Sequence, residues 1–67
     1  MSDFVVNGES RPHAPGTTIA DVVRSLSPTG EGCAVAVNAA VVPRSSWPTR
    51  TVEPGDAIEV LTAVQGG

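Results

Sequence analysis

Few side chains in this sequence have both the type and the spacing that catalysis requires. The single histidine, His13, has no other metal-ligand type of residue at ligand spacing around it, which favours a solvated surface residue. Cys33 has no histidine or lysine near it in the sequence to activate its thiol, which favours a small apolar residue of a strand. Glu53, Asp56 and Glu59 form a cluster, but turns and strand faces commonly carry solvated acids. We therefore predict neither a catalytic side chain nor a metal site.

The last two residues, Gly66 and Gly67, offer a different chemistry, in which the reactive group is a backbone carboxylate. Glycine has no Cβ, so a Gly-Gly segment can thread a narrow channel and adopt nearly any φ angle. A terminal carboxylate without a neighbouring side chain is an unhindered acyl group, which adenylation would activate for attack by a sulfur nucleophile. The two glycines alone could equally be a frayed end or residues left by cloning. Whether Gly67 is a reactive end therefore depends on the elements that position it.

The length and charge of the chain argue against several other classes of protein. A chain of 67 residues is expected to form one domain, without a second lobe to enclose a catalytic pocket. Its net charge of −3, with four arginines and no lysine, argues against binding to nucleic acid or to a membrane surface. No segment approaches the ~20 apolar residues of a membrane span. Because there is also one cysteine and no signal peptide pattern, we expect a cytoplasmic protein.

The start of the chain predicts a β-hairpin. Strands are expected near residues 3–7 and 10–13, on either side of Asn7-Gly8. Both turn residues tolerate the positive φ angles of a type I′ turn, which makes Asn-Gly the strongest short hairpin signal. The second strand contains Pro12, which cannot donate to a ladder, so we expect it at the edge of a sheet.

A short amphipathic helix is predicted next, over residues 17–26. Thr18 is a good N-cap, and Asp21 three residues later completes a capping-box-like start. The apolar residues recur at helical spacing on one face: Ile19, Val22, Val23 and Leu26. Two turns of helix do not hold alone in water, so this face must pack on a sheet.

The second half of the chain predicts further strands joined by turns. In order, these are a strand at 33–38, a turn at Ala39-Ala40, a short strand at 41–42, a 3₁₀ turn within 45–48, a type II turn at Pro54-Gly55 and a strand at 57–64. In the last strand, Ile58, Val60, Thr62 and Val64 share one face, and Leu61 lies on the other.

This order of elements predicts a two-layer α+β domain over residues 1–67, with a flexible tail at 65–67. One helix would cover one face of a mixed sheet of four to five strands. The other face would stay partly open to a partner, and Leu61 is the candidate for an exposed contact there.

Five short motifs give almost the whole chain a family resemblance. Residues 38–47, Asn-Ala-Ala-Val-Val-Pro-Arg-Ser-Ser-Trp, match the pattern N-x-x-x-V-P-R-x-x-W, and residues 55–59 match G-D-x-I-E. Together with Asn7-Gly8, the Gly16-Thr17-Thr18 entry to the helix and the final Gly-Gly, they resemble the ThiS family of sulfur carriers in the thiamine pathway. The resemblance implies the ubiquitin-like β-grasp fold.

The resemblance also implies a mechanism and partners. A ThiF-like (E1-like) adenylyltransferase would use ATP to convert the Gly67 carboxylate to an acyl-adenylate. Sulfur from a cysteine-desulfurase persulfide would then replace AMP to give a thiocarboxylate, and a ThiG-like thiazole synthase would receive that sulfur. The chain itself would bind no cofactor, would be a monomer when free, and would act as a co-substrate rather than an enzyme. Gln65 and Gly66 would line the partner's channel.

Two further residues and several functions stay open at this point. Trp47 is expected to close one end of the core, whereas Arg44 would either pair with a surface acid or contact the activating enzyme. A carrier for molybdopterin, cysteine or tRNA thiolation would have the same tail chemistry, and so would a modifier conjugated to other proteins. A β-grasp interaction module with an inactive tail is the alternative of a different class.

Overall fold

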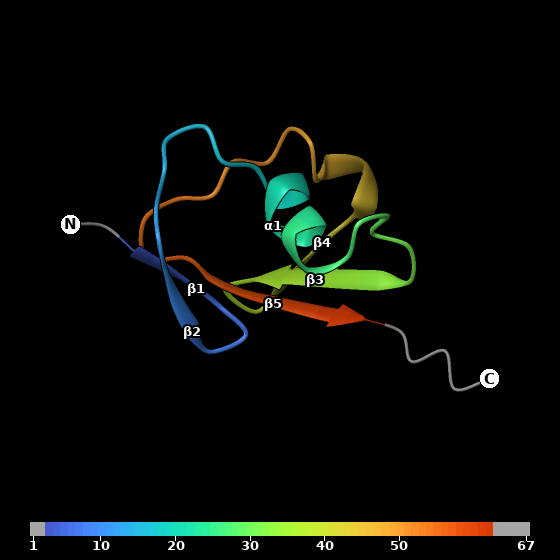
Figure 1. The fold of residues 1–67 in the computed structure, drawn as a ribbon, viewed down its shortest axis with the longest axis horizontal. Coiled ribbons are helices and arrows are strands. Elements are labelled where there is room, and N and C mark those ends of the chain that lie inside the picture. The colour runs from blue at the N-terminus through green and yellow to red at the C-terminus, as the bar shows by residue number, and fades with distance from the viewer. Residues whose placement is uncertain (1–2, 63–67) are drawn as a thin grey trace.

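The structure is a computed structural model that describes residues 3–62, and it has two layers (Figure 1). The elements are β1 (Asp3–Val6), β2 (Glu9–Pro12), α1 (Ile19–Leu26), β3 (Cys33–Val37), β4 (Ala40–Val42), the 3₁₀ helix η1 (Arg44–Ser46) and β5 (Ala57–Thr62). Helix α1 and η1 lie on the same side of one five-stranded sheet. The predicted α+β class, the order of elements and the single covering helix are confirmed.

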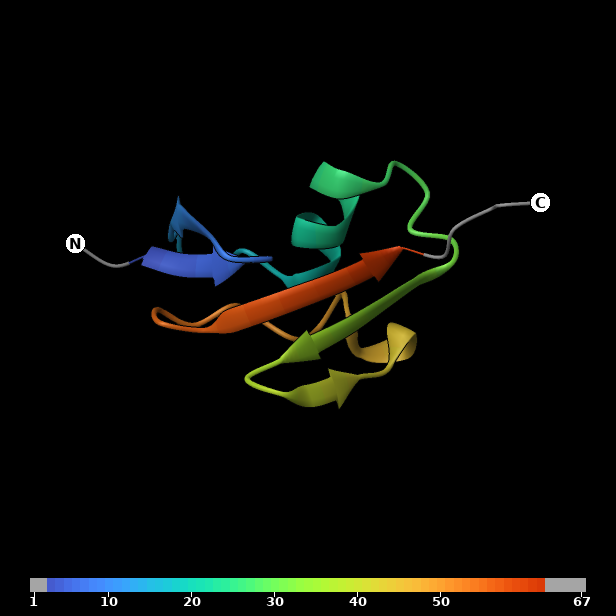
Figure 2. The same cartoon turned by 90° about the horizontal axis from the view of Figure 1, so that it is seen from below.

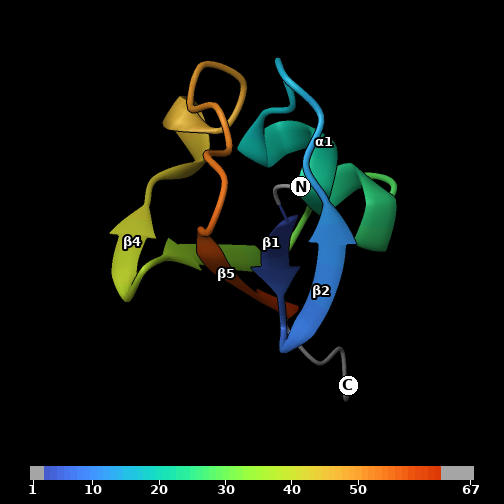
Figure 3. The ribbon, with the colours of Figure 1, turned by 90° about the vertical axis from the view of Figure 1, so that its left-hand side faces the viewer.

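The sheet has the strand order β2-β1-β5-β3-β4 and is mixed, as predicted (Figure 3). Strands β1 and β5 run parallel at its centre, and the other neighbours pair antiparallel. Strand β2, which ends at Pro12, lies at one edge, where a missing N–H does not interrupt a ladder. Strand β5 is therefore an interior strand, with β1 on one side and β3 on the other.

The start of α1 follows from its capping box. The N–H of Asp21 donates to Thr18 Oγ1 at 3.2 Å, and the N–H of Thr18 donates to Asp21 Oδ2 at 3.0 Å. Hydrogen bonds from the backbone and then the side chain of Thr18 lower the pKa of Asp21. At the other end, the N–H of Ser27 donates to the carbonyl of Val23, and Leu26 is 40% exposed. The expectation that Leu26 packs into the core is wrong, because the helix ends there and its last side chain lies at the rim.

One apolar core fills the space between the helix layer and the sheet. Its buried members are Phe4, Val6, Ile19, Val22, Val23, Val35, Val37, Val42, Trp47, Val52, Ile58 and Val60. Of the four residues predicted to share one face of the last strand, Ile58 and Val60 are buried here and Thr62 is exposed, whereas Val64 lies outside the described residues. Residues 63–67 of the predicted last strand and tail lie outside the described residues.

The tight turn between β3 and β4 differs from the prediction. It is formed by Asn38 and Ala39, which have φ angles of 51° and 69°, and Ala40 already belongs to β4. Positive φ is unusual for alanine, whereas asparagine tolerates it. The Asn38 side chain makes hydrogen bonds to Asp56 and to Ala57, the first residue of β5, and these contacts fix the turn at Asn38 and Ala39.

Candidate functional site

The candidate site begins with β5, the strand that precedes the predicted tail. Within this strand, Val60 pairs with Val35 of β3, and Ile58 pairs with both Val37 of β3 and Val6 of β1. Ile58 and Val60 are buried under the helix. Strand β5 is thus held by β1 on one side, by β3 on the other and by the helix that covers its buried face. It runs toward the end of the molecule opposite the start of β1 (Figure 2). The predicted site residues Gln65, Gly66 and Gly67 lie outside the described residues.

An asparagine side chain extends the contact between β1 and β5. Asn7 Oδ1 accepts a hydrogen bond from the N–H of Val60 at 2.9 Å, and Asn7 Nδ2 donates to the carbonyl of Val60 at 3.2 Å. The backbone of β1 pairs with β5 at Ala57 and Ile58 only, because the chain turns back after Val6. The side-chain amide of Asn7 therefore binds the N–H and carbonyl of Val60, the positions that a longer β1 backbone would otherwise bind.

Asn38 plays the same part at the other end of β5. Its Oδ1 accepts from the N–H of Ala57 at 3.0 Å, and its Nδ2 donates to Asp56 Oδ1 at 3.0 Å. Both Asn7 and Asn38 have a φ angle of 51°, at the first position of a tight turn. Sequence reasoning placed Asn7 in a turn and Asn38 at the end of a strand, and it missed the contact of either side chain with β5. The available signal was an asparagine at each turn, because asparagine tolerates a positive φ angle and its side chain can both donate and accept a hydrogen bond.

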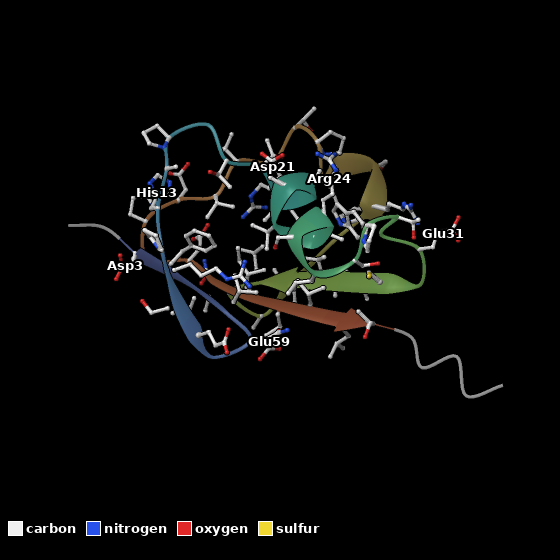
Figure 4. All side chains as sticks on the ribbon, viewed as in Figure 1. Asp3, His13, Asp21, Arg24, Glu31 and Glu59 are labelled. Carbon is white, nitrogen blue, oxygen red and sulfur yellow. The ribbon has the colours of Figure 1, made fainter. Side chains whose placement is uncertain are left out.

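The face of the sheet away from α1 is partly open and apolar. Leu61 and Val41 are 68% and 79% exposed. Together with Ala34, Ala36 and Glu59, they line a shallow hollow of about 80 Å³. Figure 4 shows Glu59 on this side of the sheet, whereas Asp21 and Arg24 lie with the helix. The structure thus places Leu61 in an exposed apolar patch of the kind that proteins use for contacts, although its role as a contact stays a prediction.

Arg44 and Trp47 contact each other across η1. The Arg44 guanidinium is stacked over the indole ring, and its Nη2 donates to the carbonyl of Thr29 at 3.3 Å. Trp47 is 5% exposed, and its Nε1 donates to the carbonyl of Val42. Trp47 therefore has the core role that was expected. The contacts of Arg44 within residues 3–62 are with the ring and a carbonyl, so the ion pair with a surface acid is not found in this part of the chain.

Two ionisable residues have structural partners that the sequence did not suggest. His13 Nε2 donates to the carbonyl of Val52 at 2.7 Å, and the ring is edge-on to Phe4. Asp56 is 8% exposed and accepts hydrogen bonds from Asn38 and from the backbone N–H of Glu53. The interpretation of Asp56 as a solvated acid is therefore wrong, because its carboxylate is buried and hydrogen-bonded. His13 is half-buried, and one nitrogen of its ring binds the segment that contains Val52.

The remaining candidates give no sign of side-chain catalysis. Cys33 is half-buried at the start of β3 and packs against the core, as a small apolar residue would. Within residues 3–62, no group of three or more histidine, cysteine or acidic side chains is arranged to hold a metal ion. The same residues contain no helix with the length and apolarity to cross a membrane.

Comparison with known proteins places this fold and these motifs in a family. The model of the ThiS family matches residues 4–67. The chain is 31% identical over 64 residues to the sulfur carrier protein ThiS of Escherichia coli (strain K12), a match that covers 96% of this chain and 97% of that protein. It is 32% identical over 64 residues to a thiazole synthase of Paramagnetospirillum magneticum, covering 96% of this chain but only 20% of that protein.

A solved structure shows the same architecture. The crystal structure of the thiamine biosynthesis protein (ThiS) from Geobacter metallireducens matches with a TM-score of 0.75 and 26% identity, over 97% of this chain and 99% of that one. The fold is thus that of the small ubiquitin-like β-grasp proteins. The chain belongs to the ThiS family, and it is a sulfur carrier of thiamine biosynthesis. As such it is a protein co-substrate rather than a catalyst.

Proposed function

We propose that the α-carboxylate of Gly67 is the group that carries sulfur. On an E1-like adenylyltransferase, a carboxylate oxygen attacks the α-phosphate of ATP, forms an acyl-adenylate and releases pyrophosphate. A persulfide derived from a cysteine desulfurase then attacks the carbonyl carbon and displaces AMP, which gives an acyl disulfide. A thiol cleaves the S–S bond by exchange and leaves a thiocarboxylate at Gly67. The ATP is consumed by the partner enzyme, and this chain contributes the acyl group.

The observation that carries this proposal is the extent of the family match, which runs from residue 4 through Gly66 and Gly67. Two structural features support it. The segment before the tail is an interior strand held by β1, β3 and two asparagine side chains. The ionisable side chains that could compete as reactive groups, His13 and Asp56, are engaged in structural hydrogen bonds. We therefore assign the reactive role to the Gly67 carboxylate, and Gly66 and Gln65 are the residues that would follow it into a partner's channel.

We further propose that a thiazole synthase accepts the sulfur. A thiazole synthase of Paramagnetospirillum magneticum contains, within a fifth of its length, a segment that matches this chain. A carrier-like segment in the same polypeptide as the acceptor enzyme supports a direct encounter between the two. The open sheet face with Leu61 is the surface that we assign to partner contact, because it is apolar and lies on the strand that leads to the tail.

Intact-mass measurement tests the proposal directly. The purified chain is incubated with its cognate ThiF-like adenylyltransferase, ATP, cysteine and a cysteine desulfurase, and the reaction is repeated with a variant that lacks Gly67. The expected product is the full chain with one oxygen exchanged for sulfur, and the truncated chain stays unchanged. An unmodified full chain under conditions where the enzyme modifies a reference ThiS would contradict the proposal. Transfer of the sulfur onward is then followed with thiazole synthase as the acceptor.

A further inference from the structure

The two asparagines that contact β5 lie at opposite ends of that strand. Asn38 binds Ala57, the first residue of β5, whereas Asn7 binds Val60, two residues before the strand ends at Thr62. The side chains are of the same type, their backbones share a φ angle of 51°, and each makes two hydrogen bonds. The two asparagines differ in their distance from the carboxyl end of the strand and in one partner, because Asn38 also donates to the Asp56 carboxylate.

Near its carboxyl end, β5 has different support on its two sides. On the β3 side, pairing continues as far as Thr62, which lies opposite Cys33. On the β1 side, backbone pairing stops at Ile58, and the amide of Asn7 is the contact that follows. Without this amide, the N–H and carbonyl of Val60 would have to bind water, and strand ends that bind water fray more readily.

We infer that Asn7 is a positioning residue for the acyl-transfer reaction, because it fixes the carboxyl-terminal half of β5, the part of the strand nearest to Gly67 in the sequence. This inference rests on the proposed function of Gly67. An activating enzyme that must receive an extended segment binds only the fraction of molecules in which this end of β5 is formed. A ligand's apparent dissociation constant rises in inverse proportion to its competent fraction. Loss of Asn7 should therefore raise KM for the carrier and leave kcat at saturation unchanged.

The substitution Asn7→Gly isolates the side chain from the turn. Glycine accepts a φ angle of 51° without strain, so the hairpin keeps its turn and only the amide is lost. The variant Asn38→Gly is the matched control, because it makes the same change in the same backbone conformation at the other end of β5. The variant Asn7→Asp keeps an acceptor for the N–H of Val60 but has no donor for its carbonyl, and should give partial rescue.

The test is ATP–pyrophosphate exchange with the cognate adenylyltransferase at varied carrier concentration. For Asn7→Gly we expect KM to rise by at most about tenfold, the factor that corresponds to the loss of about one net hydrogen bond, with kcat unchanged. Asn7→Asp should lie between this variant and wild type. Asn38→Gly should keep the wild-type KM, even if it lowers the thermal midpoint as much as Asn7→Gly does. An unchanged KM for Asn7→Gly would overturn the inference. So would a rise in KM for Asn38→Gly that equals the rise for Asn7→Gly when the two variants have the same thermal midpoint.

Amide hydrogen exchange separates this inference from the proposed function. In the free carrier, the backbone amides of Val60 and Leu61 should exchange faster in Asn7→Gly than in Asn38→Gly, and no partner is needed for this measurement. Equal exchange in the two variants overturns the positioning role, whatever the enzyme does. Absence of pyrophosphate exchange with wild-type carrier contradicts the proposed function, and the hydrogen-exchange result still decides whether Asn7 holds the end of β5.

Discussion

The guanidinium of Arg44 lies 5.5 Å from the centroid of the Trp47 ring and binds the carbonyl of Thr29 at the same time. One side chain thus joins η1 to the loop that follows α1. Behind it, the indole binds the carbonyl of Val42 in β4. The V-P-R-x-x-W segment is therefore a structural unit that closes one end of the core, with the arginine as its outer layer.

Removing the cation should lower stability modestly. For Arg44→Ala we expect the free energy of unfolding to fall by about 0.5–1.5 kcal/mol, because an exposed cation–π contact and one hydrogen bond are lost. Arg44→Lys keeps a cation without the planar fork and should lose less. Urea unfolding followed by the fluorescence of Trp47, the single tryptophan, measures both. If Arg44 also contacts the activating enzyme, KM for the carrier rises in both variants, and a wild-type KM would exclude that contact.

Leu61 should matter for binding and not for folding. It is 68% exposed, so Leu61→Gln should change the free energy of unfolding by no more than about 0.5 kcal/mol. If the open face contacts the adenylyltransferase, the affinity measured by titration calorimetry should fall by about tenfold. This is the effect of substituting an interface residue that contributes moderately to the binding free energy. Leu26→Gln is the control, because Leu26 is a partly exposed leucine on the helix layer. Equal losses in the two variants would exclude a specific role of the open face.

Gly30 should tolerate a side chain less well than Gly8. Both have positive φ angles, 70° and 85°, so alanine at either costs about 1–2 kcal/mol in backbone strain. A Cβ at Gly30 would also lie 3.4 Å from Trp47 Cζ3 and 3.4 Å from Val23 Cγ1, whereas a Cβ at Gly8 meets nothing within 4 Å. Gly30→Ala should therefore be the more destabilising, by no more than about 1 kcal/mol, because its two neighbours already stand at the shortest ordinary contact distance. Chemical denaturation of both variants checks this, and equal losses would show that the neighbours adapt freely.

The capping box should make helix stability depend on acidic pH. The hydrogen bonds from Thr18 lower the pKa of Asp21 below its ordinary value of 3.8. Because the folded-state pKa is the lower one, the stabilisation is complete well above pH 3.8 and is lost as the pH falls through the folded-state pKa. The difference in thermal midpoint between wild type and Asp21→Asn should accordingly be constant near neutral pH and shrink in acid. A difference that does not change with pH would show that the charge of Asp21 contributes nothing.

Sequence reasoning succeeded where the decisive contacts are local. The Asn7-Gly8 turn, the Thr18–Asp21 capping box and the Pro54-Gly55 turn each depend on residues within a few positions of one another. The alternation of Ile58 and Val60 predicted which face of β5 is buried, because the strand period is two. These elements, taken in order, were enough for the fold class.

The errors and omissions fall where a partner is distant in sequence or where an element ends. The contact of His13 with Val52, which is 39 positions away, was not predicted. Asp56 was expected in a solvated cluster, but Asn38 comes to it across the β3–β4 turn. Periodicity cannot show that Leu26, the last residue of α1, is left 40% exposed. The tail chemistry came from the family resemblance and from the Gly-Gly ending, and its test is biochemical.

The parallel pairing of β1 with β5 has a consequence for synthesis of the chain. The strand at the centre of the sheet is the last one to be translated, and it separates two pairs, β1–β2 and β3–β4, that are made earlier. Neither pair can bury its apolar face against a complete sheet until β5 has left the ribosome, and such long-range pairing is formed late. A prematurely terminated chain would lack the central strand and remain unfolded. The fold therefore makes translation through β5 a condition for forming the sheet.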